Sequence, residues 1–257
     1  MDRVSLDLAR LRASLPDWRV DVVEQTGSTN ADLIARAGAG EDVAGAVLLA
    51  EYQSAGRGRH GRSWSAPAHS QISMSVGVDT RGVPPDAWGW LPLLTGLAVA
   101  HPVRALGVDA GLKWPNDVLV GDRKLAGILA EVAAPVIVVG LGLNVSLTAD
   151  ELPDPRAVSL SMLGHDVDRT ALTVSLLGAL FERVAQWHAG HISALSADYR
   201  SISTTIGTRV RAILPGGSEI VGPATGIDSS GQLLIDHSGT TVTVSAGDIT
   251  HLRAAKS

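Results

Sequence analysis

The sequence predicts an α+β protein in which a mixed β-sheet with helices is followed by a small β-barrel at the C-terminus. Helical and strand-like patterns are interspersed through residues 1–204. From Thr205 onwards, short strand-like runs alternate with glycine-rich turns. The chain has 257 residues, of which 45% are apolar, and this is ample for a packed core. We therefore predict two domains, residues 1–204 and residues 205–257.

The first domain is predicted to begin with a short, leucine-containing helix within residues 2–15, which ends before Pro16. A polar turn over residues 26–30 comes later, and Asn30 is well suited to cap the helix that follows. Apolar periodicity places the other elements. The predicted strands are residues 20–24, 46–51, 72–78, 125–132 and 135–143, and the predicted helices are residues 31–37, 88–106, 170–188 and 192–199.

The segments that connect two pairs of predicted strands give further information about the sheet. The apolar runs 125–132 and 135–143 are separated by a short turn, which predicts a hairpin near the centre of the sheet. The strands 46–51 and 72–78 are separated by about twenty residues, and so long a loop in a compact domain is usually functional or disordered.

The second domain is predicted to be a β-barrel of SH3-like size. Five short strands separated by glycine-rich turns are typical of such a barrel. The predicted strands are residues 209–214, 218–228, 233–236, 240–245 and 249–253.

The composition limits the kinds of partner. A formal net charge of −5 and an isoelectric point near 5.9 argue against general binding to nucleic acid or to anionic membranes. The chain contains no cysteine, which excludes disulfides, thiolate zinc sites and cysteine nucleophiles. Residues 1–12 carry mixed charges and no long apolar run, so we expect no signal peptide, no membrane anchor and a cytoplasmic protein.

The most informative segment is AEYQSAGRGRHGRSW, residues 50–64. Glycine lets the backbone approach a ligand closely. The guanidinium groups of Arg57, Arg59 and Arg62 match phosphate and carboxylate oxygens. The segment is therefore a candidate anion clamp for a nucleotide. The alternatives are an exposed basic turn or an RGG-like segment that touches nucleic acid.

Further polar residues lie near the ends of the predicted strands. The sequence KWPND, residues 113–117, suits a rigid loop at a sheet edge, although an ordinary turn with a stacked tryptophan is the alternative. Lys124 precedes an apolar run, so its ammonium either snorkels to the surface or points into a cleft, where Gly127 would let a ligand lie against the strand. GLGLNV, residues 140–145, indicates close packing at a strand end, and no P-loop motif occurs.

Together these clusters resemble those of biotin protein ligases, also called biotin–[acetyl-CoA-carboxylase] ligases. The order and spacing agree, and the resemblance extends over nearly the whole chain from about Arg19. The segment before Val20 is too short for the winged helix-turn-helix domain that some relatives carry, which favours the monofunctional type without DNA binding. The matching segments are GSTN at 27–30, 51–64 with GRGRHGR, KWPND at 113–117, KLAGI at 124–128 and GLGLNV at 140–145.

The resemblance implies a catalytic domain related to class II aminoacyl-tRNA synthetases and an SH3-like C-terminal domain. It also implies that ATP, with Mg²⁺, activates biotin to biotinyl-5′-AMP. The biotinyl group is then transferred to one lysine of a biotin carboxyl carrier domain of acetyl-CoA or acyl-CoA carboxylase. Because the carboxylate of biotin is the first nucleophile, the protein has to neutralise charge rather than supply a nucleophile.

The resemblance further assigns roles to individual residues. Lys124 is expected to bridge the biotin carboxylate and the α-phosphate, and Asp117 to align the acceptor lysine or a magnesium ion. The expected catalytic residues are Lys124, Arg57 and Asp117; the expected biotin-binding residues are Ser28, Thr29, Asn30, Gln53, Arg57, Gly58, Arg59, Lys124 and Gly127. The expected nucleotide-binding residues are Arg59, Arg62, Trp64, Trp114, Asn116 and Asn144, and no side chain is assigned as a metal ligand.

Two other functions remain open at this point. A lipoate or octanoate ligase would use the same fold and chemistry, but the arginine loop and Ser28-Thr29-Asn30 favour a polar ureido ring over an apolar dithiolane. A non-enzymatic nucleic-acid binder is disfavoured by the negative net charge and by the lack of aromatic residues interleaved in the loop. Ser63 stands where some relatives have lysine, which leaves the details of the phosphate contacts open.

Overall fold

The computed structural model describes residues 3–214, 217–245 and 248–251. This part of the chain contains a seven-stranded mixed sheet with helices and a separate five-stranded antiparallel sheet, so the predicted α+β class is confirmed. The strands of the large sheet are β1 (Arg19–Thr26), β2 (Ala46–Gln53), β3 (Gln71–Asp79), β4 (Ala110–Lys113), β5 (Asp117–Val120), β6 (Arg123–Ala133) and β7 (Val136–Asn144). The α-helices are α1 (Leu8–Ser14), α2 (Thr29–Gly38), α3 (Leu91–Ala105), α4 (Arg169–His188) and α5 (Ile192–Ile202).

The strands of the large sheet follow the order β1-β2-β3-β7-β6-β5-β4. β1 and β2 are parallel, and all other neighbours are antiparallel. β6 and β7 form the hairpin predicted near the centre of the sheet, with Gly127 opposite Gly142. The sequence did not predict β4 and β5, because strands of four residues are too short to show a periodic pattern.

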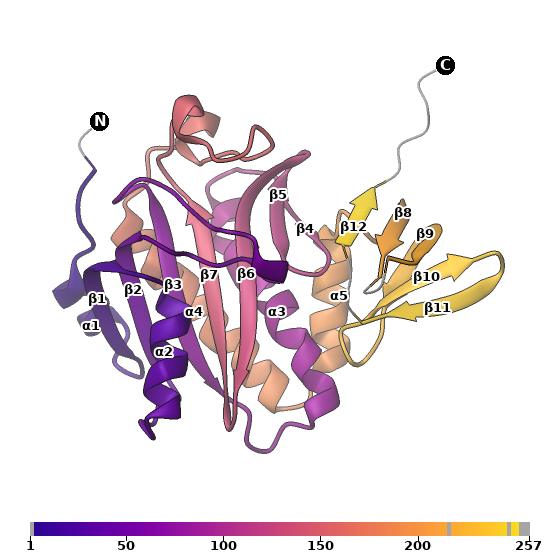
Figure 1. The fold of residues 1–257 in the computed structure, drawn as a ribbon, viewed down its shortest axis with the longest axis horizontal. Coiled ribbons are helices and arrows are strands. Elements are labelled where there is room, and N and C mark those ends of the chain that lie inside the picture. Colours follow the sequence, from indigo (N-terminus) through magenta and orange to yellow (C-terminus); the bar gives the residue numbers. More distant parts are fainter. Residues whose placement is uncertain (1–2, 215–216, 246–247, 252–257) are drawn as a thin grey trace.

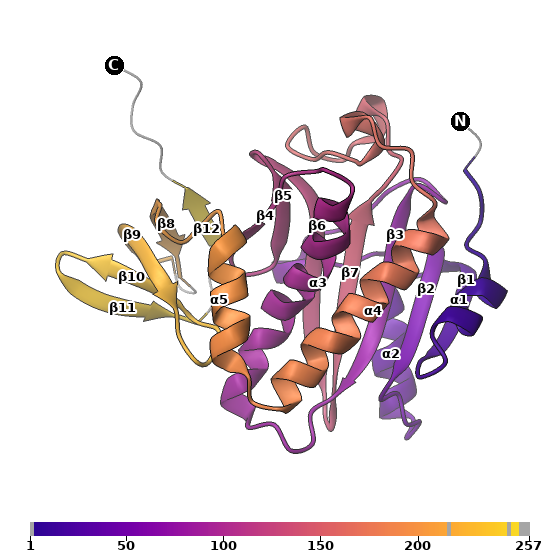
Figure 2. The ribbon, with the colours of Figure 1, turned by 180° about the vertical axis from the view of Figure 1, so that it is seen from behind.

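The two faces of the sheet are covered differently. α3 and α4 pack on the face seen in Figure 2 and bury the main core. α2 lies on the opposite face, where it covers a smaller apolar cluster that includes Leu33 and Val138. Figure 1 shows that the loop between β2 and β3 crosses the rest of this second face, in front of β7 and β6.

The sequence of β7 explains why this second face is hollow. Alternate residues of a strand point to opposite faces. Val139 and Leu141 belong to the main core, whereas Val138 lies in the cluster under α2. Gly140 and Gly142 continue the row of Val138 and carry no side chain. Side chains from other segments can therefore lie directly on the sheet at this point.

Three predicted helix boundaries were wrong, one of them the end of α5, which extends to Ile202 instead of Tyr199. Ser28, not Asn30, caps α2: its backbone is extended, and its side chain accepts a hydrogen bond from the amide of Ala31 at 3.5 Å. Asn30 is therefore inside the helix, where its side chain is available to the site. The helix predicted from Trp88 begins at Leu91, because a 3₁₀ turn over Pro85–Trp90 precedes it.

The C-terminal sheet contains the five predicted strands in the order β11-β10-β9-β8-β12. Residues 252–253 of the last predicted strand lie outside the described residues. The boundary predicted after residue 204 stays a prediction, and the chain there pairs with β4 through the amide of Thr204 and the carbonyl of Leu112, 2.8 Å apart. Among the described helices, none has the length and apolar character needed to cross a membrane. The strands are β8 (Arg209–Ile213), β9 (Glu219–Ile227), β10 (Leu233–His237), β11 (Thr240–Val244) and β12 (Asp248–His251).

Candidate active site

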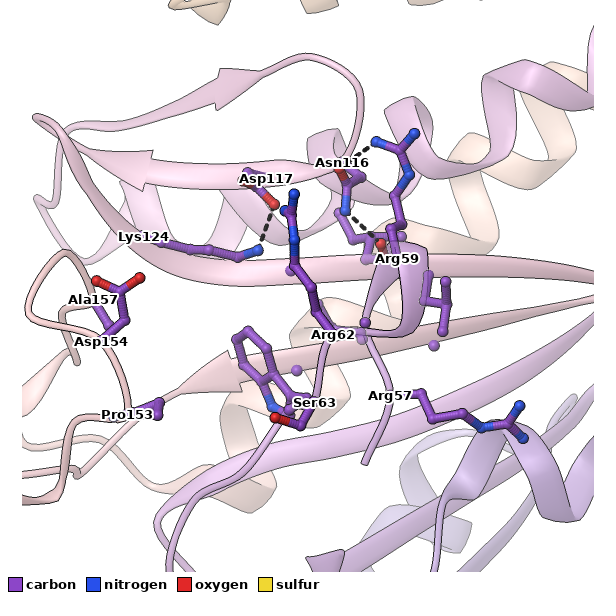
Figure 3. A pocket seen from close by; sticks show the side chains of 18 of the residues that line it. Arg57, Arg59, Arg62, Ser63, Asn116, Asp117, Lys124, Pro153, Asp154 and Ala157 are labelled. Atoms are coloured by element: carbon purple, nitrogen blue, oxygen red, sulfur yellow. Dashed lines mark hydrogen bonds and ion pairs between the residues drawn. The ribbon is translucent and has the colours of Figure 1, made fainter. Parts of the chain in front are cut away.

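A cavity of about 1180 Å³ lies on the hollow face of the large sheet. The loop after β2, the loop between β4 and β5, and the starts of β6 and α2 surround it, and Figure 3 shows part of its lining. All of the site residues predicted from the sequence line this one cavity. They are Ser28, Thr29, Asn30, Gln53, Arg57, Gly58, Arg59, Arg62, Trp64, Trp114, Asn116, Asp117, Lys124, Gly127 and Asn144.

Gly140 and Gly142 form the floor of the cavity. A Cβ atom on Gly140 would lie 2.2 Å from Oδ1 of Asn30, and one on Gly142 would lie 2.3 Å from the ring of Trp64. Both separations are far below van der Waals contact. Glycine is therefore required here so that Asn30 and Trp64 can lie directly on the sheet, and the predicted close packing is confirmed.

A buried polar network lies at the first turn of α2. The amide and hydroxyl of Thr29 donate to Oε1 of Gln53 at 2.8 and 3.1 Å. The single hydroxyl hydrogen of Ser75, on β3, is shared between the hydroxyl of Thr29, 2.7 Å from Oγ, and Oδ1 of Asn30. The side-chain amide of Asn30 donates to the carboxylate of Glu131 at 2.8 Å. These partners hold the polar groups of Thr29, Asn30 and Gln53 in defined orientations, as recognition of a small polar ring requires.

The arginine loop is folded on itself and attached to the sheet. The amide of Gly58 donates to the carbonyl of Arg62 at 2.7 Å, and Arg57 and Ser63 form an isolated β-bridge. Arg59 donates to the side chain of Asn116 at 3.2 Å. Arg57 lies 3.5 Å from the carboxylate of Glu131, and Figure 3 shows its guanidinium directed away from Lys124. Arg57 therefore shares the cavity with the other predicted catalytic residues but is not in contact with them.

Lys124 and Asp117 form an ion pair with 2.6 Å between Nζ and Oδ1. Asp117 begins β5 and Lys124 lies near the start of β6, and these strands are paired. Among the described residues, Oδ1 of Asp117 has no hydrogen-bond partner besides this ammonium. The ammonium also lies 5.5 Å from the centre of the Trp64 ring. The lysine thus points into the cavity, which was one of the two alternatives left open by the sequence.

Other residues that shape the cavity were missed in the sequence. Ser75 and Glu131 orient Asn30, and the alternation of Ser73 and Ser75 within an otherwise apolar strand was the available signal. Asp154 lies on the loop that pairs with Lys124, and nothing in its sequence neighbourhood marks it.

Asp154 brings a negative charge to the rim of the cavity, as Figure 3 shows. The hydrogen-bonded Arg156 guanidinium holds the pKa of the Asp154 carboxyl below its ordinary value, and the charge of Lys124 acts weakly in the same direction. Near neutral pH, Asp154 is therefore an anion facing the same space as Lys124.

The chain is similar to known proteins over both of its parts. The biotin/lipoate A/B protein ligase family matches residues 22–146, and the biotin protein ligase C-terminal domain matches residues 205–252. The biotin–[acetyl-CoA-carboxylase] ligase of Mycobacterium tuberculosis is 53% identical over 98% of this chain and 97% of that protein. The bifunctional ligase/repressor BirA of Escherichia coli is 32% identical over 98% of this chain and 79% of that protein.

A solved structure agrees with these matches. The biotin protein ligase from Aquifex aeolicus in complex with biotin and ATP superposes with a TM-score of 0.80 at 25% identity, covering 92% of this chain and 99% of that one. The sequence motifs, the cavity that they line and the similarity along the chain agree, and this chain belongs to the biotin protein ligase family.

Proposed function

We propose that this protein activates biotin with ATP and transfers the biotinyl group to one lysine of a biotin carboxyl carrier domain of acetyl-CoA or acyl-CoA carboxylase. The observation that carries the proposal is the position of the Lys124 ammonium in a single cavity that also holds the α2 network and the arginine loop. The reaction consumes ATP, and we assign it to the cytoplasm.

In the first step a carboxylate oxygen of biotin attacks the α-phosphorus of ATP. A bond forms between this oxygen and the α-phosphorus. The bond between the α-phosphorus and the oxygen that bridges to the β-phosphate breaks, and pyrophosphate leaves. The step brings a carboxylate close to a polyphosphate, so cations must offset the repulsion. Lys124 supplies one positive charge, and the arginine loop supplies Arg57, Arg59 and Arg62.

Biotin would lie with its ureido ring at the first turn of α2. The ring offers two N–H donors and one carbonyl acceptor, so it needs both acceptors and donors from the protein. Ser28, Thr29, Asn30 and Gln53 provide hydroxyl and amide groups of both kinds. The glycine floor would let the rest of the molecule lie on β6 and β7 with its carboxylate toward Lys124.

The adenylate would occupy the other half of the cavity. Trp64 offers an aromatic surface, Trp114 lines the cavity from an almost completely buried position, and Asn116 and Asn144 offer amide groups. Arg59 already contacts Asn116, so closure of the arginine loop and formation of the nucleotide site are linked.

In the second step the amine of the acceptor lysine attacks the acyl carbon of biotinyl-5′-AMP. An amide bond forms, the acyl–phosphate bond breaks, AMP leaves, and the nitrogen loses a proton. We assign Asp117 to alignment of this amine, because its carboxylate lies beside Lys124 and therefore beside the activated carboxyl group.

The Mg²⁺ that accompanies ATP fits a site with few protein ligands. Within the described residues no group of three or more His, Cys, Asp or Glu side chains is arranged to hold a metal ion. Asp117 and Asp154 line the cavity, and Mg²⁺ is commonly held by one or two carboxylates together with substrate phosphates. When bound, the ion would offset phosphate charge, and these two aspartates are the candidates to contact it.

ATP–pyrophosphate exchange tests the first step. Purified protein is assayed with Mg²⁺ and biotin, lipoate, octanoate or no acid, and we expect exchange with biotin alone. Exchange only with lipoate or octanoate would contradict the assignment of biotin as the substrate. No exchange with any acid would contradict the proposed adenylation reaction. Transfer is then tested with a carrier domain and with the same domain whose acceptor lysine is replaced by arginine.

A further inference from the structure

The turn between β9 and β10, residues 228–231, joins the C-terminal sheet to the large domain. The indole N–H of Trp90 donates to the carbonyl of Ser229 at 2.9 Å. The indole N–H of Trp114 donates to the carbonyl of Gly231 at 3.0 Å. Both indoles are almost completely buried. One short turn of the C-terminal sheet therefore accepts hydrogen bonds from two tryptophans of the large domain.

Trp114 is attached to residues beyond 204 at two points. Besides its indole contact, its backbone amide donates to the hydroxyl of Thr205 at 3.1 Å. Thr205 immediately follows the segment that pairs with β4. Trp114 lies between these two contacts, and its position depends on both.

The turn is built to hold one shape. The Asp228 carboxylate accepts from the amides of Ser230 and Gln232 at 2.9 and 2.8 Å. A Cβ atom on Gly231 would lie 2.7 Å from the carbonyl oxygen of Gly89, so the two backbones touch directly. Backbone groups packed this closely cannot slide without losing contact.

Trp114 is the first residue of the loop that carries the polar groups of the adenylate half. Two residues later, Asn116 binds Arg59 and the carbonyl of Ile128. Asp117 then pairs with Lys124. The Ile213 and Ile249 side chains of the C-terminal sheet also line this cavity. The position of the turn is thus transmitted through Trp114 to the residues that meet ATP.

We propose that the 228–231 turn is a positioning element for the nucleotide half of the active site and acts through Trp114. The proposal rests on the adenylation reaction proposed above. The C-terminal sheet contributes in this way to the affinity for ATP. The hydrogen-bond partners of the α2 network, Gln53, Ser75 and Glu131, all lie on strands of the large sheet, so we expect biotin affinity to be independent of the turn.

The main test uses two aspartates with the same local role. Asp228→Ala removes the two side-chain hydrogen bonds that hold the 228–231 turn, and Asp228 does not line the cavity. Asp236→Ala removes an equivalent side-chain bond to the amide of Gly239, 2.8 Å long, in the next turn of the same sheet. In biotin-dependent ATP–pyrophosphate exchange, Asp228→Ala should raise KM for ATP about two- to tenfold, the effect of one or two lost hydrogen bonds. KM for biotin in Asp228→Ala should stay within about twofold of the wild-type value. In Asp236→Ala, KM for ATP and KM for biotin should both stay within about twofold of wild type.

A second pair of variants examines the indole contact. Trp114→Phe removes the N–H that reaches Gly231 and keeps an aromatic ring. Trp187→Phe removes a comparable buried bond, 2.9 Å from the indole nitrogen to the carbonyl of Ala87, which is not made to the 228–231 turn. Trp114→Phe should raise KM for ATP, whereas Trp187→Phe should lower thermal stability without that change.

Hydrogen–deuterium exchange separates positioning from general loosening. In Asp228→Ala, amides of residues 112–118 should exchange faster, while those of β3 keep their protection. Faster exchange in both segments, or an unchanged KM for ATP in folded Asp228→Ala and Trp114→Phe, would overturn the proposal. If wild-type protein shows no biotin-dependent ATP–pyrophosphate exchange at all, the proposed adenylation reaction itself is wrong. This outcome is distinct from a failure of the positioning role alone.

Discussion

Lys124 is the residue on which the proposed adenylation depends most directly. Its ammonium contacts Asp117 and lies over the ring of Trp64, and its backbone is fixed by pairing with the 156–158 segment. Asp117 and the pairing with the 156–158 segment, neither of which belongs to the arginine loop, therefore orient the lysine. An oriented charge stabilises a transition state without reorganisation at the moment of reaction.

Replacement of this lysine should lower adenylation while the protein remains folded. Losing a charge-assisted hydrogen bond costs about 1.5–3 kcal/mol, so Lys124→Ala should reduce the exchange rate at least about ten- to a hundredfold. Arg123→Ala is the control, because Arg123 is an exposed neighbour that does not line the cavity. Equal rates for Lys124→Ala and wild type would remove Lys124 from the mechanism.

Ser75 and Ser73 provide a matched pair for the α2 network. Both are buried on the same face of β3, but Ser75 binds Thr29 and Asn30, whereas Oγ of Ser73 has no hydrogen-bond partner among the described residues. Ser75→Ala should weaken biotin binding about two- to tenfold, the usual effect of one hydrogen bond. Ser73→Ala should leave it unchanged. Isothermal titration with biotin measures both, and equal affinities for the two variants would contradict a role of Ser75 in orienting the network.

At the scale of elements, the arginine loop and the sheet behave differently. The sheet is held by backbone pairing and two apolar clusters. At its start the loop pairs through its backbone, because the amides of Ser54 and Ala55 donate to the carbonyls of Thr26 and Gly27 at 2.9 Å. Further along, its side-chain contacts include Arg57 with Glu131, Arg59 with Asn116 and Trp64 with Gln71. Ordering a loop costs about 1–2 kcal/mol per residue in backbone entropy, so contacts with a ligand should shift its equilibrium.

We therefore predict that residues 54–68 are disordered without ligand and become ordered when biotin or the adenylate binds. Trypsin should cut after Arg57, Arg59 or Arg62 in the free protein and much more slowly with biotin present. Cleavage after Arg81, whose side chain is 69% exposed and remote from the cavity, is the internal reference. Equal protection of the loop with and without biotin would refute this mechanism of closure.

At the scale of the whole molecule, a buried ion pair connects the N-terminal segment with the core. Glu51 on β2 lies 2.7 Å from Arg169 of α4 and accepts a hydrogen bond from the backbone amide of Leu6. Arg169 also donates to the carbonyl of Val4 at 2.6 Å. Glu51 is 1% exposed, so neither charge of the pair could be rehydrated if its partner were removed.

Glu51→Ala should thus be strongly destabilising. Leaving Arg169 without its partner should reduce the free energy of unfolding by about 3–5 kcal/mol. The exposed pair of Arg36 and Glu41 is the control, and Glu41→Ala should leave the urea midpoint nearly unchanged, because solvent screens an exposed pair. Urea unfolding of both variants measures the difference, and similar midpoints would show that the buried pair contributes little.

Much of the fold and of the site was predictable from particular residues. The runs 125–132 and 135–143 predicted the central hairpin, because apolar strands leave a clear local pattern. The motifs at residues 27–30, 51–64, 113–117, 124–128 and 140–145 led to predicted site residues that all line one cavity. The short strands β4 and β5 were not predictable, because they have too few residues for a periodic signal. The orientation of the Asn30 side chain was not predictable either, because it depends on Ser75 and Glu131.

By itself, the sequence determined the class of fold, the family resemblance and many of the residues that meet in one cavity, because these follow from local periodicity and from short motifs. Only the tertiary structure decided how the set is arranged. It directs Arg57 away from Lys124, pairs Lys124 with Asp117, and joins Trp114 to a carbonyl 117 residues further along the chain. Contacts over such separations leave no local signature, because they arise only when the large sheet and the C-terminal sheet pack together.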